Sequence, residues 1–257
     1  MLGLGIGFYK LAGNDYPLGG APLSPTTIAS DDLLFWFDSE QNVTEDRGTV
    51  TVWQAAHYSE SGDLFAIPTV AGQTALIAGT PTGVNGIGTG GSNTFELKDA
   101  ASSGSDVQLT LDTSDGGWTI MGIYTATDWN GAQQALFGDP DDSSNFFRHD
   151  AADSFTVKAS NQARTFDLDS ALTDDNFVSV MLVCSEGGEM VLYINNTAQA
   201  DTESFSDATK DLVIEQFGRR ATTDTLTGKL KQLVVWEIAL TSAQRTQVDT
   251  WSQEYIS

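Results

Sequence analysis

The sequence predicts an all-β fold: a two-sheet antiparallel jelly-roll sandwich with one C-terminal helix and an extended N-terminal arm. Three observations support this. More than ten short runs rich in β-branched and aromatic residues follow one another from residue 31 to residue 240, with turn residues between them. Helical periodicity occurs only near the C-terminus. The first 30 residues hold six glycines and three of the chain's six prolines, a density that prevents a regular helix.

Residues 1–30 form the predicted arm. Only two of them are charged, which makes a freely solvated tail unfavourable, although a disordered leader is the alternative. The segment lacks the basic start of a secretory signal peptide, so we expect none. We expect the arm to dock on a particle or on a neighbouring subunit through its apolar side chains, Leu2, Leu4, Ile6, Phe8 and Leu11.

Residues 31–257 form the predicted jelly-roll domain. The runs at 118–126 and 177–184 are apolar at successive positions, as expected of central strands that are buried on both faces. Asp115-Gly116-Gly117 and Asn130-Gly131 are turn signals between runs. The remaining strands are expected over 33–37, 49–53, 74–78, 93–98, 107–111, 155–159, 190–195, 212–218 and 230–240.

The C-terminal helix is expected to begin at a capping residue, Thr241 or Ser242. Val248, Trp251 and Tyr255 then recur at helical spacing and form one stripe. We expect this stripe to pack against the sandwich rather than to bind a ligand.

Four tryptophans lie in the predicted strands and are expected in the core: Trp36, Trp53, Trp118 and Trp236. The single cysteine, Cys184, excludes an intrachain disulfide framework and a cysteine-based zinc site. It lies in an apolar run, so we expect it to be a buried core residue.

The charge of the chain excludes two classes of partner. Lys and Arg number 12 against 35 Asp and Glu, which gives a net charge of -23. A field of this sign repels phosphate backbones and anionic lipids, so we expect no nucleic-acid partner. No run approaches the ~20 apolar residues of a transmembrane helix, so we expect no membrane insertion.

Three segments resemble the concanavalin A-like, laminin-G-type jelly-roll domains: Leu33 to Asp38 (LLFWFD), Leu192 to Asn196 (LYINN) and Gly228 to Arg245. The family usually has glycine where this chain has Asn196, a substitution that a left-handed turn tolerates. The resemblance spans about residues 31–257 and implies the fold, which hosts lectins, glycan hydrolases and structural modules. The opening MLGLG also resembles the leaders of tail-fibre and head proteins of tailed bacteriophages.

No catalytic residues are predicted. Glycan hydrolases on this fold place acidic residues on one strand roughly as E-x-D-x-E, and the sequence has no such triplet. Glu186 and Glu189 flank a Gly-Gly turn and are expected to be solvated. The two histidines, His57 and His149, belong to no recognisable nucleophile motif, so we expect no enzyme activity.

One loop contains oxygen ligands at the close spacing that calcium prefers: Asp139, Asp141, Asp142 and Asn145. The alternative is a solvated acidic loop in which Arg148 supplies part of the counter-charge. No cofactor is expected to be required, and calcium is the one ion that the sequence suggests.

A loop tryptophan is the best candidate for glycan or partner contact. Trp129 is flanked by Asp128, Asn130 and Gln133, a combination of one stacking ring and several hydrogen-bonding groups that suits a sugar. The same ring could equally anchor a subunit contact or pack within its own chain.

Taken together, these features predict a non-enzymatic bacteriophage virion structural protein, either a head decoration or a fibre-type protein. Its arm would dock on the particle and its jelly roll would face outward. The expected partners are other virion proteins and further copies of the chain, and the expected location is the virion, assembled in the host cytoplasm. The alternative is a carbohydrate-binding module or adhesin that recognises host-surface glycans.

Overall fold

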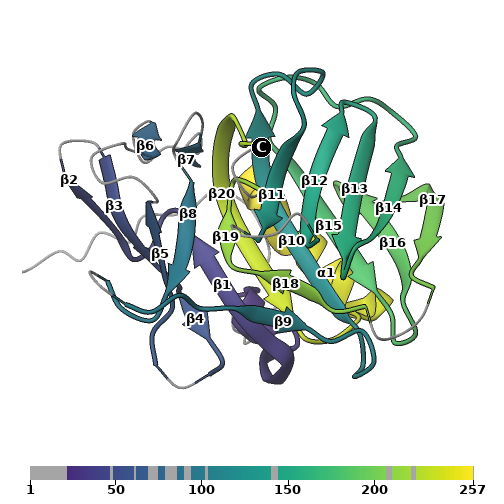
Figure 1. The fold of residues 1–257 in the computed structure, drawn as a ribbon, viewed down its shortest axis with the longest axis horizontal. Helices are drawn as coiled ribbons and strands as arrows, with labels where there is room; N and C mark the ends of the chain where they lie inside the picture. The colour runs from purple at the N-terminus through teal and green to yellow at the C-terminus, as the bar shows by residue number, and fades with distance from the viewer. Residues whose placement is uncertain are drawn as a thin grey trace, which may run out of the picture.

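The computed structural model describes residues 22–46, 49–60, 62–68, 75–78, 86–89, 94–101, 104–139, 144–206, 210–220 and 224–256. It confirms the predicted fold class, a two-sheet antiparallel sandwich with one C-terminal helix (Figure 1). The docking residues proposed for the arm, Leu2 to Leu11, lie outside the described residues.

Two sheets face each other across the core. Sheet A contains β1 (Leu33–Asp38), β4 (His57–Tyr58), β7 (Gly86–Thr89), β10 (Trp118–Ala126), β15 (Val178–Cys184), β16 (Glu189–Ile194), β17 (Thr197–Ser204) and β20 (Gly228–Trp236). Sheet B contains β2 (Val43–Asp46), β3 (Thr49–Gln54), β5 (Phe65–Pro68), β8 (Phe95–Lys98), β11 (Gln134–Gly138), β12 (Phe146–Ala151), β13 (Ser154–Ala159), β14 (Gln162–Asp167) and β19 (Gln216–Phe217). Strand β6 (Ala75–Ala78) pairs with β3 and with β7, and β9 (Leu109–Leu111) pairs with β18 (Leu212–Ile214).

The central strand of sheet A is buried along its whole length, as its apolar sequence predicts. Strand β10 pairs with β15 on one side and β20 on the other, so that Met121 lies opposite both Met181 and Val234. One face of β10 turns to the space between the sheets, and the other turns to the helix. A strand covered on both faces cannot show the apolar–polar alternation of a half-wet strand.

Aromatic side chains fill the space between the sheets. Phe37 contacts Trp53 and Phe217 with ring centroids 5.1 Å apart in each pair, both edge-on. The four tryptophans predicted in strands are all buried, and so is Cys184. These predictions are confirmed.

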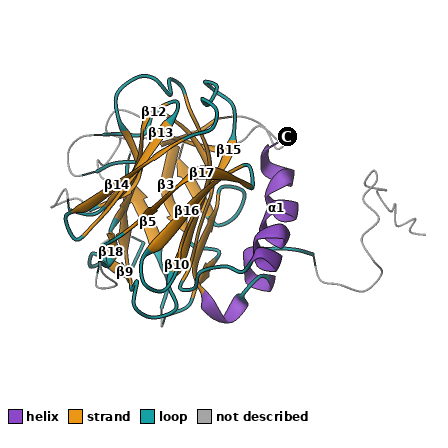
Figure 2. Ribbon diagram, turned by 90° about the vertical axis from the view of Figure 1, so that its right-hand side faces the viewer, coloured by secondary structure: helices purple, strands orange, loops and turns teal. Residues whose placement is uncertain are grey.

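Helix α1 (Ser242–Ile256) covers the outward face of sheet A (Figure 2). Thr241 and Gln244 form a reciprocal capping box: the Thr241 amide donates to Gln244 Oε1 at 2.8 Å, and the Gln244 amide donates to Thr241 Oγ1 at 3.3 Å. Val248 and Trp251 are buried against the sheet, and Tyr255 packs beside them. The predicted cap and packing stripe are confirmed.

Residues 22–32 pack on the same side of the sandwich. Two short 3-10 turns, Pro25–Thr27 and Ser30–Asp32, lead into β1. Between them Ile28 is fully buried, and its carbonyl accepts a hydrogen bond from Trp236 Nε1 at 3.0 Å. The boundary predicted between residues 30 and 31 therefore falls within a packed segment.

The hairpin between β16 and β17 turns as the sequence predicts. Asn195 and Asn196 both have positive φ, 46° and 60°, in the left-handed region that asparagine tolerates. Where the helices are described, none is long and apolar enough to cross a membrane.

Candidate functional site

The outward face of sheet B is the candidate site, because α1 covers the opposite side of the sandwich (Figure 2). Alternation along β12 separates the two faces of the sheet. Phe147 and His149 are fully buried on the core side. Arg148 and Asp150, each of which follows one of them in the strand, face outward. The sequence predicts one loop that contains Asp139 and Asn145, and its pattern does not predict β11, β12 or β14. The polar outward residues of β12 interrupt the hydrophobic pattern that would have revealed a strand.

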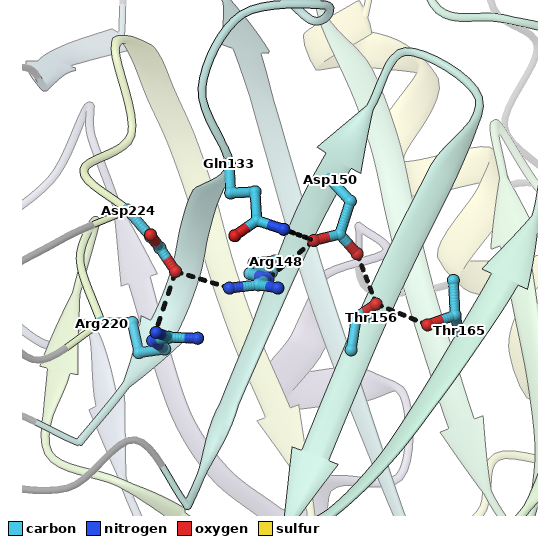
Figure 3. Close-up of polar contacts among 7 residues, drawn as sticks. All are labelled: Gln133, Arg148, Asp150, Thr156, Thr165, Arg220 and Asp224. Carbon is cyan, nitrogen blue, oxygen red and sulfur yellow. Dashed lines mark hydrogen bonds and ion pairs between the residues drawn. The ribbon is translucent and has the colours of Figure 1, made fainter.

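A chain of ion pairs begins on β12. Arg148 Nη1 lies 2.6 Å from Asp224 Oδ2, and Arg148 Nε lies 2.8 Å from Asp150 Oδ1 (Figure 3). Arg220 Nε reaches the same Asp224 oxygen at 3.2 Å. The side chains of Arg148 and Asp224 are only 11% and 12% exposed, so these pairs are shielded from bulk solvent more than ordinary surface pairs.

The network continues across β13 and β14. Gln133 Nε2 donates to Asp150 Oδ1 at 2.7 Å, and the Thr156 hydroxyl donates to the other oxygen of the same carboxylate. Thr156 and Thr165 join their hydroxyls at 2.8 Å. We call these seven residues the outer polar row: Gln133, Arg148, Asp150, Thr156, Thr165, Arg220 and Asp224.

An aromatic ring fixes the two guanidinium groups. Arg148 and Arg220 lie over the ring of Phe146, with their central carbons 4.6 Å and 4.8 Å from its centroid. Phe146 is itself nearly fully buried under them. The guanidinium planes are thus held by stacking as well as by carboxylates, which makes the row rigid.

The segment from Gly218 onward brings Arg220 and Asp224 over β11. The Gly218 amide donates to the Leu136 carbonyl at 2.9 Å, and the Ala135 amide donates to the Asp224 carbonyl at 2.7 Å. A side chain on Gly138 would lie 2.5 Å from the Arg219 carbonyl oxygen, so glycine is required for this close approach.

The structure corrects the expectation of an exposed ring at Trp129. Its side chain is fully buried: Nε1 donates to the Thr173 carbonyl at 3.1 Å, and the ring lies 4.5 Å from that of His149. Of the three alternatives, packing within the chain fits this placement, because neither face of the indole is open to a sugar or a subunit. Asp128, Asn130 and Gln133 are exposed as expected, and Gln133 belongs to the outer polar row.

His149 is a buried titratable group beneath this face. Neither ring nitrogen has a hydrogen-bond partner among the described residues, and burial lowers the pKa of the imidazole to about 4. The hydroxyl of Tyr124, whose ring also contacts Trp129, likewise lacks a partner. The other histidine, His57, forms a hydrogen bond between its ring Nε2 and the Leu33 carbonyl oxygen at 3.1 Å. Neither histidine has a serine or cysteine hydrogen-bonded to it within the described chain.

The calcium prediction loses one of its ligands. Asn145 Oδ1 accepts the backbone amides of Ser160 and Val213 at 3.2 Å and 3.3 Å, so its oxygen ties two segments together. Asp141 and Asp142 lie outside the described residues. Asp139 is buried, and its polar groups are not without a partner. The residues that can be placed include no group of three His, Cys, Asp or Glu side chains suited to a metal ion.

Two hollows lie elsewhere on the sandwich. One, of about 380 Å³, is lined by carboxylates that include Asp32, Asp115 and Glu237. Partial burial, and then the charges of Glu60, Asp115 and Asp32, raise the pKa of Glu237. The other, of about 440 Å³, lies between the loop before β15 and the end of α1, beside Asn176, Phe177 and Ile256.

A family model described as the concanavalin A-like lectin/glucanases superfamily matches residues 89–244, more than half of the chain. The chain belongs to this superfamily. The matched region includes β10 to β20 and therefore the whole outer polar row. No curated protein matches the sequence.

Solved structures agree on the fold. Trypanosoma rangeli sialidase in complex with 2,3-difluorosialic acid is similar with a TM-score of 0.57 at 12% identity, over 96% of this chain and 36% of the sialidase. The binding domain of botulinum neurotoxin DC in complex with SialylT is similar with a TM-score of 0.54 at 12% identity, over 88% of this chain and 51% of that domain. This chain thus spans about a third of the sialidase and half of the neurotoxin domain. Likeness at such identity establishes the architecture and not the ligand.

Proposed function

We propose that this protein is a non-enzymatic, lectin-type carbohydrate-binding module whose glycan site lies on the outward face of sheet B. One observation carries the proposal: the outer polar row is a rigid array of hydrogen-bonding groups on the sheet face opposite the helix. Of the two readings that the sequence leaves open, this is the one that the superfamily and the geometry support.

The row suits a polyhydroxylated ligand. Guanidinium groups donate, carboxylates accept, and the hydroxyls of Thr156 and Thr165 do either, which matches the mixed character of sugar hydroxyls. Because the side chains brace one another, binding orders few of them, and the entropy cost of association is reduced. Every described aromatic side chain is buried or half-buried, so this site would recognise a sugar mainly by hydrogen bonds.

The same geometry favours binding over hydrolysis. Asp150 and Asp224 are the carboxylates of the row, and both are engaged by Arg148, so they act as a brace for the guanidinium. The sequence lacks the acidic triplet expected on one strand for hydrolysis.

The ligands of the two structural neighbours also fit a glycan as the ligand of this chain. The sialidase is in complex with 2,3-difluorosialic acid, and the neurotoxin binding domain is in complex with SialylT.

A glycan array with the full chain tests the proposal. We expect a glycan hit whose affinity falls about fivefold or more in Gln133→Ala, because one hydrogen bond at the edge of the row is lost. Gln253→Ala, an exposed glutamine on α1, is the matched control and should bind as the wild type does. A folded protein that binds no glycan, or one that releases reducing sugar from its ligand, contradicts the proposal.

The virion role stays a prediction. It rests on the apolar, glycine-rich pattern of residues 1–30, and residues 1–21 lie outside the described chain. The same holds for virion partners, for self-association and for assembly in the host cytoplasm. A glycan-binding jelly roll is compatible with an outward-facing virion position, so the two readings differ in the attachment of the chain and not in the site.

A further inference from the structure

Several cationic side chains lie near Phe146 on the outward face of sheet B, within a chain of net charge -23. Arg148 and Arg220 stack on its ring and share Asp150 and Asp224 as carboxylate partners. Lys158, the cross-strand partner of Phe146, adds a cation that has no ion pair among the described residues. Arg219, next to Arg220, adds another.

Arg219 forms no ion pair with a carboxylate among the described residues. Within the described chain its polar contact is one long hydrogen bond, from Nη2 to Gln216 Oε1 at 3.4 Å, and its buried Nε has no partner. Its backbone is held in place by the close approach to Gly138, and the side chain is half-buried. The position of this arginine is therefore set by the fold, although no acidic side chain of the described segments forms an ion pair with it.

Gln216 supplies a second unused donor at the same place. Its side chain is fully buried and extends from β19 on the outward side, because its neighbour Phe217 faces the core. Its Oε1 turns toward Arg219, and its Nε2 has no hydrogen-bond partner in the part of the chain that the structure describes. A buried amide donor without an acceptor is unfavourable, and it lies beside the half-buried Arg219 guanidinium, so this part of the sheet has more donors than acceptors.

We propose that Arg219 and Gln216 form a subsite for the carboxylate of an acidic sugar, so that the glycan bound on the outer polar row is an acidic one. This inference rests on the proposed glycan-binding function. The planar guanidinium can donate two parallel hydrogen bonds to a carboxylate, a geometry that Lys cannot offer, and the buried Gln216 amide positions the guanidinium through Oε1. Arg220, the next residue, places the subsite at the end of the row.

The charge of the whole chain narrows the ligand further. A net charge of -23 repels polyanions at long range. A small glycan with one carboxylate is repelled much less, because it carries a single charge. Terminal sialic acid and a single hexuronic acid both present such a group. We therefore expect an oligosaccharide with one carboxylate to bind better than a polyuronate chain.

Calorimetric titration of the full chain tests the subsite. The probes are 3′-sialyllactose, a glucuronic-acid-terminated disaccharide, a polyuronate and neutral lactose. We expect a singly charged probe to bind at least tenfold more tightly than lactose, and Arg219→Gln to remove about tenfold of that affinity, the size expected for a hydrogen bond to a charged group. Gln216→Glu should have the same effect, because it supplies an internal carboxylate for Arg219. Arg164→Gln, at an arginine on β14 outside the row, is the control, and thermal melting reports whether each variant is folded.

The outcomes separate this inference from the proposed function. Equal binding of lactose and the acidic probes, or acidic binding that folded Arg219→Gln and Gln216→Glu variants retain, overturns the subsite and leaves a glycan-binding module. If the folded wild type binds none of these probes but binds another neutral glycan on the array, the subsite is again wrong and the module stands. If it binds no glycan at all, both are wrong.

Discussion

The two sheets of this sandwich have outward faces of opposite character. The outward face of sheet A is apolar: Trp36, Met121 and Trp236 face the helix, and α1 buries them with Val248 and Trp251. The outward face of sheet B is polar and is braced by ion pairs, hydroxyls and one aromatic ring. The core between the sheets is shared, so the difference shows that one outer face adds to stability by burying apolar surface while the other stays polar.

The largest test of this comparison is the helix-covered face. Trp251→Ala should lower the free energy of unfolding by about 3–5 kcal/mol, because a buried indole that contacts Trp36 at 6.2 Å between ring centroids is removed. Urea unfolding measures it. Gln247→Ala, at an exposed position of α1 one turn before Trp251, should change stability by under about 1 kcal/mol. Comparable losses in the two variants would contradict a packed helix–sheet interface.

His149 tests the inner side of sheet B through pH. Burial lowers its pKa to about 4, below the ordinary value of about 6.5, so the unfolded chain binds more protons than the folded chain in this window. Stability should therefore fall as the pH drops from 6.5 toward 4, by up to about 3 kcal/mol, and this contribution should level off below pH 4.

His149→Phe should flatten that part of the pH profile, because it keeps a ring against Trp129 and removes the titrating group. The wild-type protein is the reference, and its profile should keep the slope. Urea midpoints between pH 4 and pH 7 measure both. Wild-type and His149→Phe midpoints that fall in parallel would show that the histidine is not the source.

A smaller effect is expected at Gly138, where the backbone of Arg219 and Arg220 packs closely against β11. Gly138→Ala should cost about 1–3 kcal/mol, because the new methyl group would meet the Arg219 carbonyl oxygen and the Arg220 Cα, 2.5 Å and 2.9 Å away. Displacement of these two residues should also weaken glycan binding. Gly131→Ala, which would meet the movable Asp128 side chain at 3.0 Å, should leave both properties nearly unchanged. Melting temperature and titration distinguish loss of fold from loss of the site.

Residues of sheet A were easier to predict than residues of the site. An unbroken apolar run predicts strand β10, and apolar residues at helical spacing predict helix α1, because both elements bury a wide apolar surface. Strand β12 reads FFRHDA, and its outward Arg148 and Asp150 look like loop residues until the partners that bury them are known. For Trp129 the error is the opposite one. Its polar sequence neighbours predict an exposed loop, whereas the structure buries the ring.

The sequence by itself determined the all-β class, the capped helix and its packing stripe, the buried cysteine and the left-handed asparagine turn. These features depend on local periodicity and backbone preference, which neighbouring residues in the chain settle. Tertiary structure alone decided that Arg148 meets Asp224, 76 residues away, and that the backbone of Arg219 approaches Gly138 closely. Such contacts join segments far apart in sequence, and their energies depend on burial and distance, which the order of residues does not reveal.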